Sequence, residues 1–235
     1  YTKGVYDNSL KFTLQGNELS KQIGYTDGVA IALNNIGLIL IGQNKFKEAL
    51  VELQQAVIIN NQLQSDKNLT SNYFNIALCN VELANYSDAL VALDKTIALS
   101  KKTNNEILLV MSTNKLGDIA FRKEEYLKAI NYHRQVIEHK KIPHEWEDAF
   151  AYTGIAMSYL ELQQYDKAIV NGEKGLQYAK KIDAKWDIER SLSVLYKANA
   201  AVGNYKDAFQ YLENNKNYND SLYNEQKEKE INALH

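Results

Sequence analysis

The residues that could do chemistry are few, and their spacing fits no metal site. The histidines form no i,i+4 pair, and HEWED at 144–148 lacks the second histidine that would complete the HExxH pattern of zinc proteases. The single cysteine, Cys79, excludes an internal disulfide and a cysteine-rich metal site. We therefore expect no metal or cofactor, and surface positions for all four histidines. These histidines are His133, His139, His144 and His235.

The segment GLILIG at 37–42 has the glycine spacing of a phosphate-binding loop. That loop requires Lys and Ser/Thr directly after it, but Gln43 and Asn44 stand there instead. No GxSxG nucleophile motif and no catalytic Cys–His signature is present. Because an activity has to be argued from a site, we expect the chain to be non-catalytic.

The composition and net charge of the chain bear on which classes of partner it could bind. The chain has 235 residues and a formal net charge of −2, which gives no electrostatic reason to expect binding to nucleic acid or to an acidic membrane. No apolar run approaches the ~18–20 residues needed to span a bilayer. The chain begins at Tyr1 with no signal-peptide pattern, so any targeting or membrane segment is expected outside it. With a single proline, Pro143, and no period-two alternation, the sequence predicts an all-helical fold.

A repeat of about 40 residues is the strongest pattern in the sequence. Five stretches, among them GQNKFKEAL, LANYSDAL and VGNYKDAF, each carry an aromatic residue followed three positions later by alanine, at spacings of 40, 40, 39 and 40. Four of the five have a small residue nine positions before the aromatic, which would let two antiparallel helices approach closely. The aromatics are Phe46, Tyr86, Tyr126, Tyr165 and Tyr205; the alanines are Ala49, Ala89, Ala129, Ala168 and Ala208; the small residues are Gly37, Ala77, Gly117 and Ala156.

This pattern resembles the tetratricopeptide repeat (TPR), in a variety of about forty residues per helix pair. The resemblance implies an all-α, right-handed superhelical solenoid of antiparallel helix pairs. It divides the chain into a TPR array at 1–219, which opens with a lone half-repeat at 6–23, and a connecting helix at 220–235. The expected pairs are 28–42 with 45–63, 69–84 with 86–103, 106–122 with 125–139, 145–162 with 164–182, and 186–202 with 205–218.

In TPR arrays the first helix of each pair lines a concave groove, so the repeat phase names the candidate binding residues. The groove is expected to be apolar and aromatic in the middle and basic at the last pair. The candidates are Asn34, Asn35, Leu38, Ile41, Phe74, Asn75, Leu78, Met111, Asn114, Asp118, Phe121, Phe150, Met157, Arg190 and Lys197. The same projection includes Lys115, Thr153, Leu160 and Ser193.

Asparagines recur in this projected groove. Asn34, Asn35, Asn75 and Asn114 each offer a donor and an acceptor, which could hold the backbone of an extended peptide without reading its sequence. An LNNL-type motif plays this part in several TPR families, including the kinesin light chains. The alternative is structural, because the aliphatic residues could pack against the next pair and the asparagines could bond neighbouring helices. We interpret Trp146 and Trp186, forty residues apart, as packing residues between pairs.

The C-terminal tail suggests a further helix. Asp220 and Ser221 are typical helix caps, and Ile231 and Leu234 have the spacing that opens a heptad seam. This seam is the basis for a possible homodimer through the C-terminal helix.

The tail also resembles that of a family of signalling proteins. After the array come Tyr218, Asp220, Ser221, Leu222, Tyr223, Asn224, Glu225 and Lys227, a Y-x-x-D-S-L-[FY]-N-E-x-K pattern. This pattern is similar to that of the TPR-containing sensor histidine kinases and LuxR-type regulators of Gram-negative bacteria. The resemblance implies a periplasmic sensory region of an inner-membrane protein that binds a protein or peptide in the groove, without contacting nucleic acid or membrane itself. The alternative is a cytosolic TPR scaffold with no sensory role.

Overall fold

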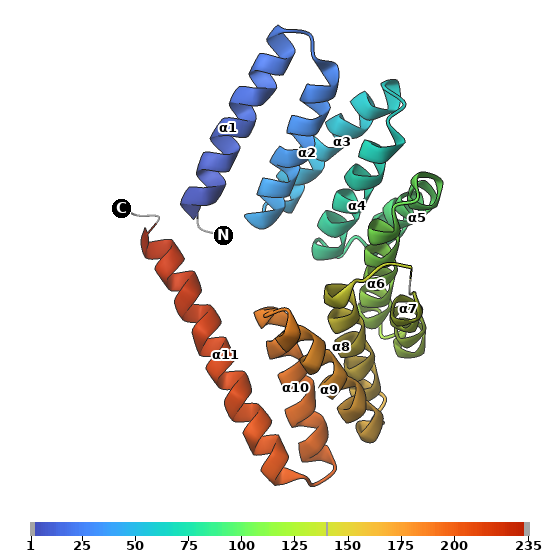
Figure 1. The fold of residues 1–235 in the computed structure, drawn as a ribbon, viewed down its shortest axis with the longest axis vertical. Helices are drawn as coiled ribbons and strands as arrows, with labels where there is room; N and C mark the ends of the chain where they lie inside the picture. The colour runs from blue at the N-terminus through green and yellow to red at the C-terminus, as the bar shows by residue number, and fades with distance from the viewer. Residues whose placement is uncertain (1–2, 140, 233–235) are drawn as a thin grey trace. The chain divides into compact units, whose positions relative to one another are not determined.

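The computed structural model describes residues 3–139 and 141–232, and within these ranges it contains eleven α-helices and no strand (Figure 1). The all-helical expectation is therefore confirmed. The helices are α1 (Lys3–Gln22), α2 (Thr26–Gly42), α3 (Phe46–Gln62), α4 (Asp66–Glu82), α5 (Tyr86–Thr103), α6 (Glu106–Arg122), α7 (Tyr126–Glu138), α8 (Glu145–Glu161), α9 (Tyr165–Lys181), α10 (Lys185–Ala201) and α11 (Tyr205–Asn232).

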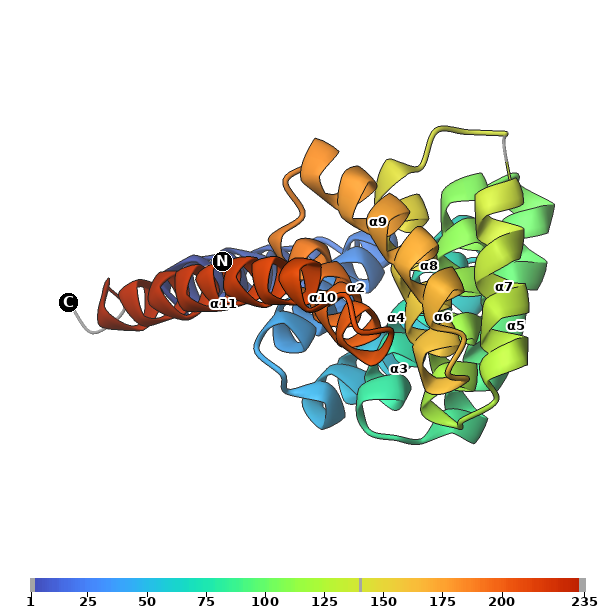
Figure 2. The ribbon, with the colours of Figure 1, turned by 90° about the horizontal axis from the view of Figure 1, so that it is seen from below.

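The chain forms two compact units. Unit 1 contains the described residues up to 112 together with 228–232, and unit 2 contains the described residues from 113 to 227. In unit 1, α2 pairs with α3 and α4 with α5, while α1 packs against α2 as the partnerless half-repeat would. In unit 2, α8 pairs with α9, and α10 packs against α9. Figure 2 gives a second view of these helix stacks.

Close approach within a pair depends on the small residue of the repeat. A Cβ atom placed on Gly37 of α2 would lie 2.7 Å from the side chain of Leu53 on α3, so any other residue there would require Leu53 to shift. Leu53 is fully buried in a core that includes Ile36, Leu40 and, from the next pair, Cys79. The glycine-framed segment 37–42 is thus a packing surface inside α2, and its last residue ends that helix.

The turns between helices repeat as regularly as the helices. Most helices are followed by one residue in the left-handed conformation, which lets the chain reverse direction. These residues recur about every 20 positions. Glycine is favoured in this conformation because it has no Cβ, but most of these turns use another residue. The left-handed residues are Gly24, Asn44, Gln64, Ala84, Asn104, Glu124, Gln163, Asp183 and Gly203.

The final helix differs from expectation. We expected a helix ending at 218 and a new one capped by Asp220 and Ser221, but α11 runs without a break from Tyr205 to Asn232. The residues around 218–221 continue the hydrogen-bonded helix, so the cap prediction is wrong. Leu234 and the side chain of Ile231 lie outside the described part of the chain, and the heptad seam stays a prediction. Across the described helices, none is both long and apolar enough to cross a bilayer.

Candidate functional site

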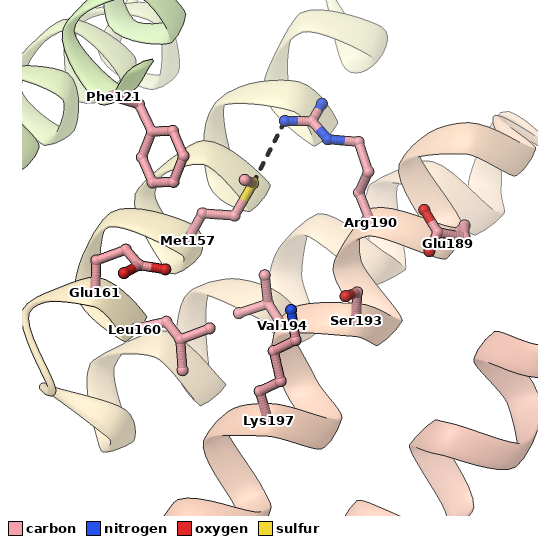
Figure 3. A pocket seen from close by; sticks show the side chains of 9 residues that line it. All are labelled: Phe121, Met157, Leu160, Glu161, Glu189, Arg190, Ser193, Val194 and Lys197. Carbon is pink, nitrogen blue, oxygen red and sulfur yellow. Dashed lines mark hydrogen bonds between the residues drawn. The ribbon is translucent and has the colours of Figure 1, made fainter. Parts of the chain in front are cut away.

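A pocket in unit 2 lies where three successive first helices meet. Phe121 comes from α6, Met157 and Leu160 from α8, and Arg190 from α10, and these side chains surround a depression of about 120 Å³ (Figure 3). Ser193, Val194, Lys197, Glu161 and Glu189 complete the lining. The structure therefore brings together six residues that the repeat phase projects onto one face: Phe121, Met157, Leu160, Arg190, Ser193 and Lys197.

Arg190 is held in place by three contacts beside this pocket. Its Nη2 lies 3.5 Å from Sδ of Met157, its guanidinium carbon lies 4.6 Å from the centre of the Phe150 ring, and its Nη1 lies 3.6 Å from Oδ1 of Asp187. Burial raises the pKa of the Asp187 carboxyl, while the nearby Arg190 lowers it. A guanidinium positioned over an aromatic ring is a common device for presenting positive charge at an apolar surface.

A second cation approaches the same ring. Nζ of Lys115 lies 4.9 Å from the centre of the Phe150 ring. Oδ2 of Asp118 lies 4.0 Å from Nζ of Lys115 and 3.4 Å from Nε of Arg122. Lys197, by contrast, is exposed and has no carboxylate partner among the described residues. Of the cations lining the pocket, Lys197 is thus the one whose charge is most available to a ligand.

Asn114 does not serve the groove as predicted. Its Nδ2 donates to the main-chain oxygen of Glu147 at 3.0 Å and to Oε2 of the same residue at 2.6 Å, and its Oδ1 lies 2.8 Å from Nδ1 of His133. Both residues of the Asn114–His133 pair are buried. The prediction that Asn114 contacts a ligand is therefore wrong, because both polar atoms of its side-chain amide are hydrogen-bonded within the protein.

His133 also contradicts the expectation of surface histidines, since it is only 1% exposed. Its ring fills the space between two glycines: a Cβ on Gly117 of α6 would lie 2.6 Å from the ring, and one on Gly154 of α8 would lie 2.4 Å from it. His133 occupies the repeat position of Leu53 and Leu93. The side chain of His144 is likewise buried, 3.3 Å from Asp148.

In unit 1 the predicted asparagines join a row of amides. Oδ1 of Asn34 accepts from Nδ2 of Asn72 at 2.9 Å and from Nδ2 of Asn75 at 3.0 Å. Asn72 in turn accepts from Nδ2 of Asn60 at 2.8 Å. Nδ2 of Asn34 makes no hydrogen bond within the described ranges. The row therefore fixes the orientation of Asn34 while leaving its donor available.

The remaining unit 1 candidates separate into exposed and buried positions. Asn35 and Leu38 are exposed, and Ile41 and Leu78 are half-buried. Phe74 and Asn75 are buried, so they support the helix packing and the amide row instead of offering contact surface. For these two residues the structural alternative is the better description. Met111, on the first half of α6, is half-buried.

Two tryptophans contradict their expected packing role. Trp146 is 59% exposed and Trp186 is 67% exposed, so neither is a packing residue between pairs. Trp146 lies four residues before Phe150 on α8, and Trp186 lies four residues before Arg190 on α10. Residues four apart share a helix face, which places both indoles on the faces projected onto the groove, with Trp186 one turn before the pocket residue Arg190. Their i,i+4 spacing to predicted groove residues is the sequence signal that identifies them.

Comparisons with known proteins agree with this architecture. Residues 29–63 match the family described as "Tetratricopeptide repeat". No curated protein matches the sequence. BtubC (BKLC) from P. vanneervenii superposes with a TM-score of 0.76 at 14% identity, covering 93% of this chain and 92% of that one.

Two other solved structures show the same fold. The apo form of the quorum sensor NprR from B. thuringiensis gives a TM-score of 0.77 at 13% identity, with coverage of 91% of this chain and 61% of NprR. A Podosopora anserina putative kinesin light chain with TPR-like repeats gives 0.61 at 18% identity, covering 82% and 95%. Residues 29–63 are thus a tetratricopeptide repeat, and the chain has the all-helical fold of tetratricopeptide-repeat proteins.

Proposed function

We propose that this chain is a non-catalytic TPR domain that binds an extended peptide or a segment of a partner protein. The observation that carries the proposal is the pocket between α6, α8 and α10, which gathers apolar side chains, a fixed Arg190 and an available Lys197. Its volume of about 120 Å³ is well below the roughly 300–1,000 Å³ of small-molecule sites, and suits one side chain of a longer ligand.

Each part of the groove has a distinct task in this proposal. An apolar ligand side chain enters the pocket against Met157 and Leu160, and an acidic group of the ligand pairs with Lys197. The exposed indoles of Trp146 and Trp186 offer large, rigid contact areas of the kind enriched in binding hot spots.

The amides of unit 1 form a separate candidate surface within that unit. The free donor of Asn34 and the exposed amide of Asn35 can bond peptide carbonyls and N–H groups without selecting side chains. The solved complex of NprR with its cognate peptide NprX, at a TM-score of 0.69 and 13% identity, supports peptide binding as a use of this fold.

The test is to select binders from a random 12-residue peptide library on the immobilised chain and to measure their affinity by fluorescence anisotropy. Trp146→Ala, Trp186→Ala and Lys197→Glu should each weaken the selected peptides at least tenfold. Leu127→Ala is the matched control, because Leu127 is as exposed as the tryptophans but lies on α7, outside the groove-lining helices. Equal affinities for all four variants, or no enriched peptide, would contradict groove binding.

Asn35→Ala tests backbone capture separately. The substitution should weaken a selected peptide while leaving the melting temperature unchanged, since the side chain is exposed and makes no hydrogen bond within the described ranges. If the affinity stays the same, the amides have only the structural role that Asn72 and Asn60 show.

We further propose that the domain is the extracytoplasmic sensory region of a membrane-bound bacterial signalling protein. The support is the tail pattern from Tyr218 to Lys227, together with the unbroken course of α11, which offers a rigid connection out of the last helix pair. A ligand would act by favouring one of two conformations that α11 transmits. The full coding sequence decides this. An apolar span of ~20 residues followed by a kinase or helix-turn-helix module supports the proposal, and a gene without either favours a cytosolic scaffold.

A further inference from the structure

Met157 places a thioether in the wall of the pocket in unit 2, beside an arginine. Its side chain is half-buried and lies among the apolar residues Phe121, Leu160 and Val194, which line the same depression (Figure 3). Sδ of Met157 lies 3.5 Å from Nη2 of Arg190. Because the Met157 side chain is partly exposed, a small oxidant in solution can reach its sulfur.

Arg190 is held in a position that suits a stronger acceptor than a thioether. Its Nη1 lies 3.6 Å from Oδ1 of Asp187 and its guanidinium carbon lies 4.6 Å from the centre of the Phe150 ring, while Nη2 faces the sulfur. A thioether is a weak acceptor, whereas a charged N–H group makes strong hydrogen bonds to polar oxygen over about 2.7–3.2 Å. An oxygen atom bound to Sδ can therefore reach Nη2 after a small shift of the Met157 side chain.

Oxidation by hydrogen peroxide supplies this oxygen. The sulfur lone pair attacks one peroxide oxygen, and an S–O bond forms as the O–O bond breaks. The proton on the transferred oxygen passes to the departing hydroxide, which leaves as water, so the sulfur loses two electrons and the peroxide gains them. The product, methionine sulfoxide, is polar where the thioether was apolar, and methionine sulfoxide reductases reverse the reaction.

We propose that Met157 is a reversible oxidation site, at which the sulfoxide oxygen accepts a hydrogen bond from Nη2 of Arg190 and makes this wall of the pocket polar. The consequence for binding rests on the proposed function. An apolar ligand side chain in the pocket is bound more weakly after oxidation, because it then lies against a polar oxygen. The other methionine of the chain, Met111 on α6 within unit 1, serves as an internal reference.

The first test needs no ligand. The chain is treated with hydrogen peroxide, peptide mapping by mass spectrometry locates the added oxygen, and the side-chain signals of ¹⁵N-labelled arginine are recorded before and after. The Arg190 signals should shift and their proton exchange with water should slow at least threefold, whereas Arg134 on α7 should be unaffected. Met157→Leu should show no change at Arg190. Cys79 should stay reduced, since it is buried and burial raises the pKa of its thiol to about 11.

Two outcomes of this test would overturn the proposal. One is a Met157 that stays unoxidised at a peroxide concentration that fully oxidises a free methionine peptide. The other is an Arg190 whose signals and exchange stay the same although Met157 carries the added oxygen.

The second test measures the consequence for binding. A peptide selected on the untreated chain should bind the oxidised chain at least tenfold more weakly by fluorescence anisotropy, and methionine sulfoxide reductases should restore its affinity. Met157→Leu should keep its affinity after peroxide treatment, because leucine has a similar volume and no sulfur. Met111→Leu should lose affinity as the wild type does. Unchanged wild-type affinity, or an equal loss in Met157→Leu, would contradict the effect on the pocket. Failure to select any peptide would instead contradict the proposed function, and the first test then decides the oxidation site by itself.

Discussion

Nδ1 of His133 lies 2.8 Å from Oδ1 of Asn114, and the two side chains form a buried polar pair in which His133 stands at a repeat position that is leucine in earlier pairs. Because Nδ2 of Asn114 donates to Glu147, its Oδ1 is the acceptor and His133 must carry its proton on Nδ1. The buried ring is thereby fixed as one neutral tautomer. A buried histidine in place of leucine makes the stability of unit 2 depend on pH.

The stability of the protein should fall as the pH is lowered from 6.5 towards 4. Burial lowers the pKa of His133 from 6.5 to about 4; Arg190 on α10 and Lys115 on α6 act in the same direction, and Asp118 opposes them. The unfolded chain then binds more protons than the folded one between these two values. The free energy of unfolding should decrease by roughly 3 kcal/mol across the window, measured by urea denaturation at a series of pH values.

His133→Leu isolates this contribution. The difference between the wild-type and variant pH profiles should contain the loss between pH 6.5 and 4, because other titrating groups such as Glu147 and Asp187 remain in both proteins. At pH 7 the variant should be less stable by ~1–3 kcal/mol, since Oδ1 of Asn114 loses its donor. Parallel profiles would show that His133 is protonated without cost in the folded state.

Gly117→Ala and Gly154→Ala should each destabilise the protein by ~1–3 kcal/mol through overpacking. In both cases the new methyl group would overlap the His133 ring, at 2.6 Å and 2.4 Å. Gly16→Ala on α1 is the control, because a Cβ there meets nothing within 4 Å. The control should instead gain up to ~1 kcal/mol from the higher helix propensity of alanine. Thermal unfolding compares the three, and a gain at all of them would mean that the ring moves freely.

Asn72→Leu should cost ~1–3 kcal/mol of stability. Asn72 is buried in the amide row, where it accepts from Asn60 and donates to Asn34. Its loss leaves Nδ2 of the buried Asn60 without its acceptor, while Oδ1 of Asn34 keeps the hydrogen bond from Asn75. Asn35→Leu on the exposed side of α2 should change the free energy of unfolding by less than ~0.5 kcal/mol. Chemical denaturation of both variants measures the contrast. Equal effects would mean that the row contributes nothing as a network.

The 40-residue spacing of the repeat predicts the helix boundaries well because the repeated residues mark the helix faces that must be buried. Nine of the ten helices in the five pairs begin and end within three residues of the expected positions, and α11 is the exception. The phase also projects Met157, Arg190 and Lys197 onto one face, and the structure places them around one pocket.

The repeat spacing does not reveal the hydrogen-bond partner of each polar side chain. Asparagine is equally suited to an open groove and to a buried hydrogen bond, so Asn34 and Asn114 looked alike in the sequence although Asn114 is enclosed. The burial of His133 did leave a signal, because it stands at a leucine position opposite Gly117. Recognising that pair would have corrected the expectation of surface histidines.

The left-handed turns give a final prediction, since most of them use a residue other than glycine. Ala84 has a φ of 58°, a conformation that costs an L-residue with a Cβ roughly 1–2 kcal/mol, and its side chain is exposed. Ala84→Gly should therefore raise the free energy of unfolding by about 0.5–1 kcal/mol, because the relief of this strain exceeds the extra entropy that glycine loses on folding. Ala49→Gly, at a buried helical position in α3, should do the opposite and destabilise by at least ~1 kcal/mol. Thermal unfolding of the two variants side by side measures both effects. If Ala84→Gly were also destabilising, contacts of the Ala84 side chain would outweigh the backbone strain of the turn.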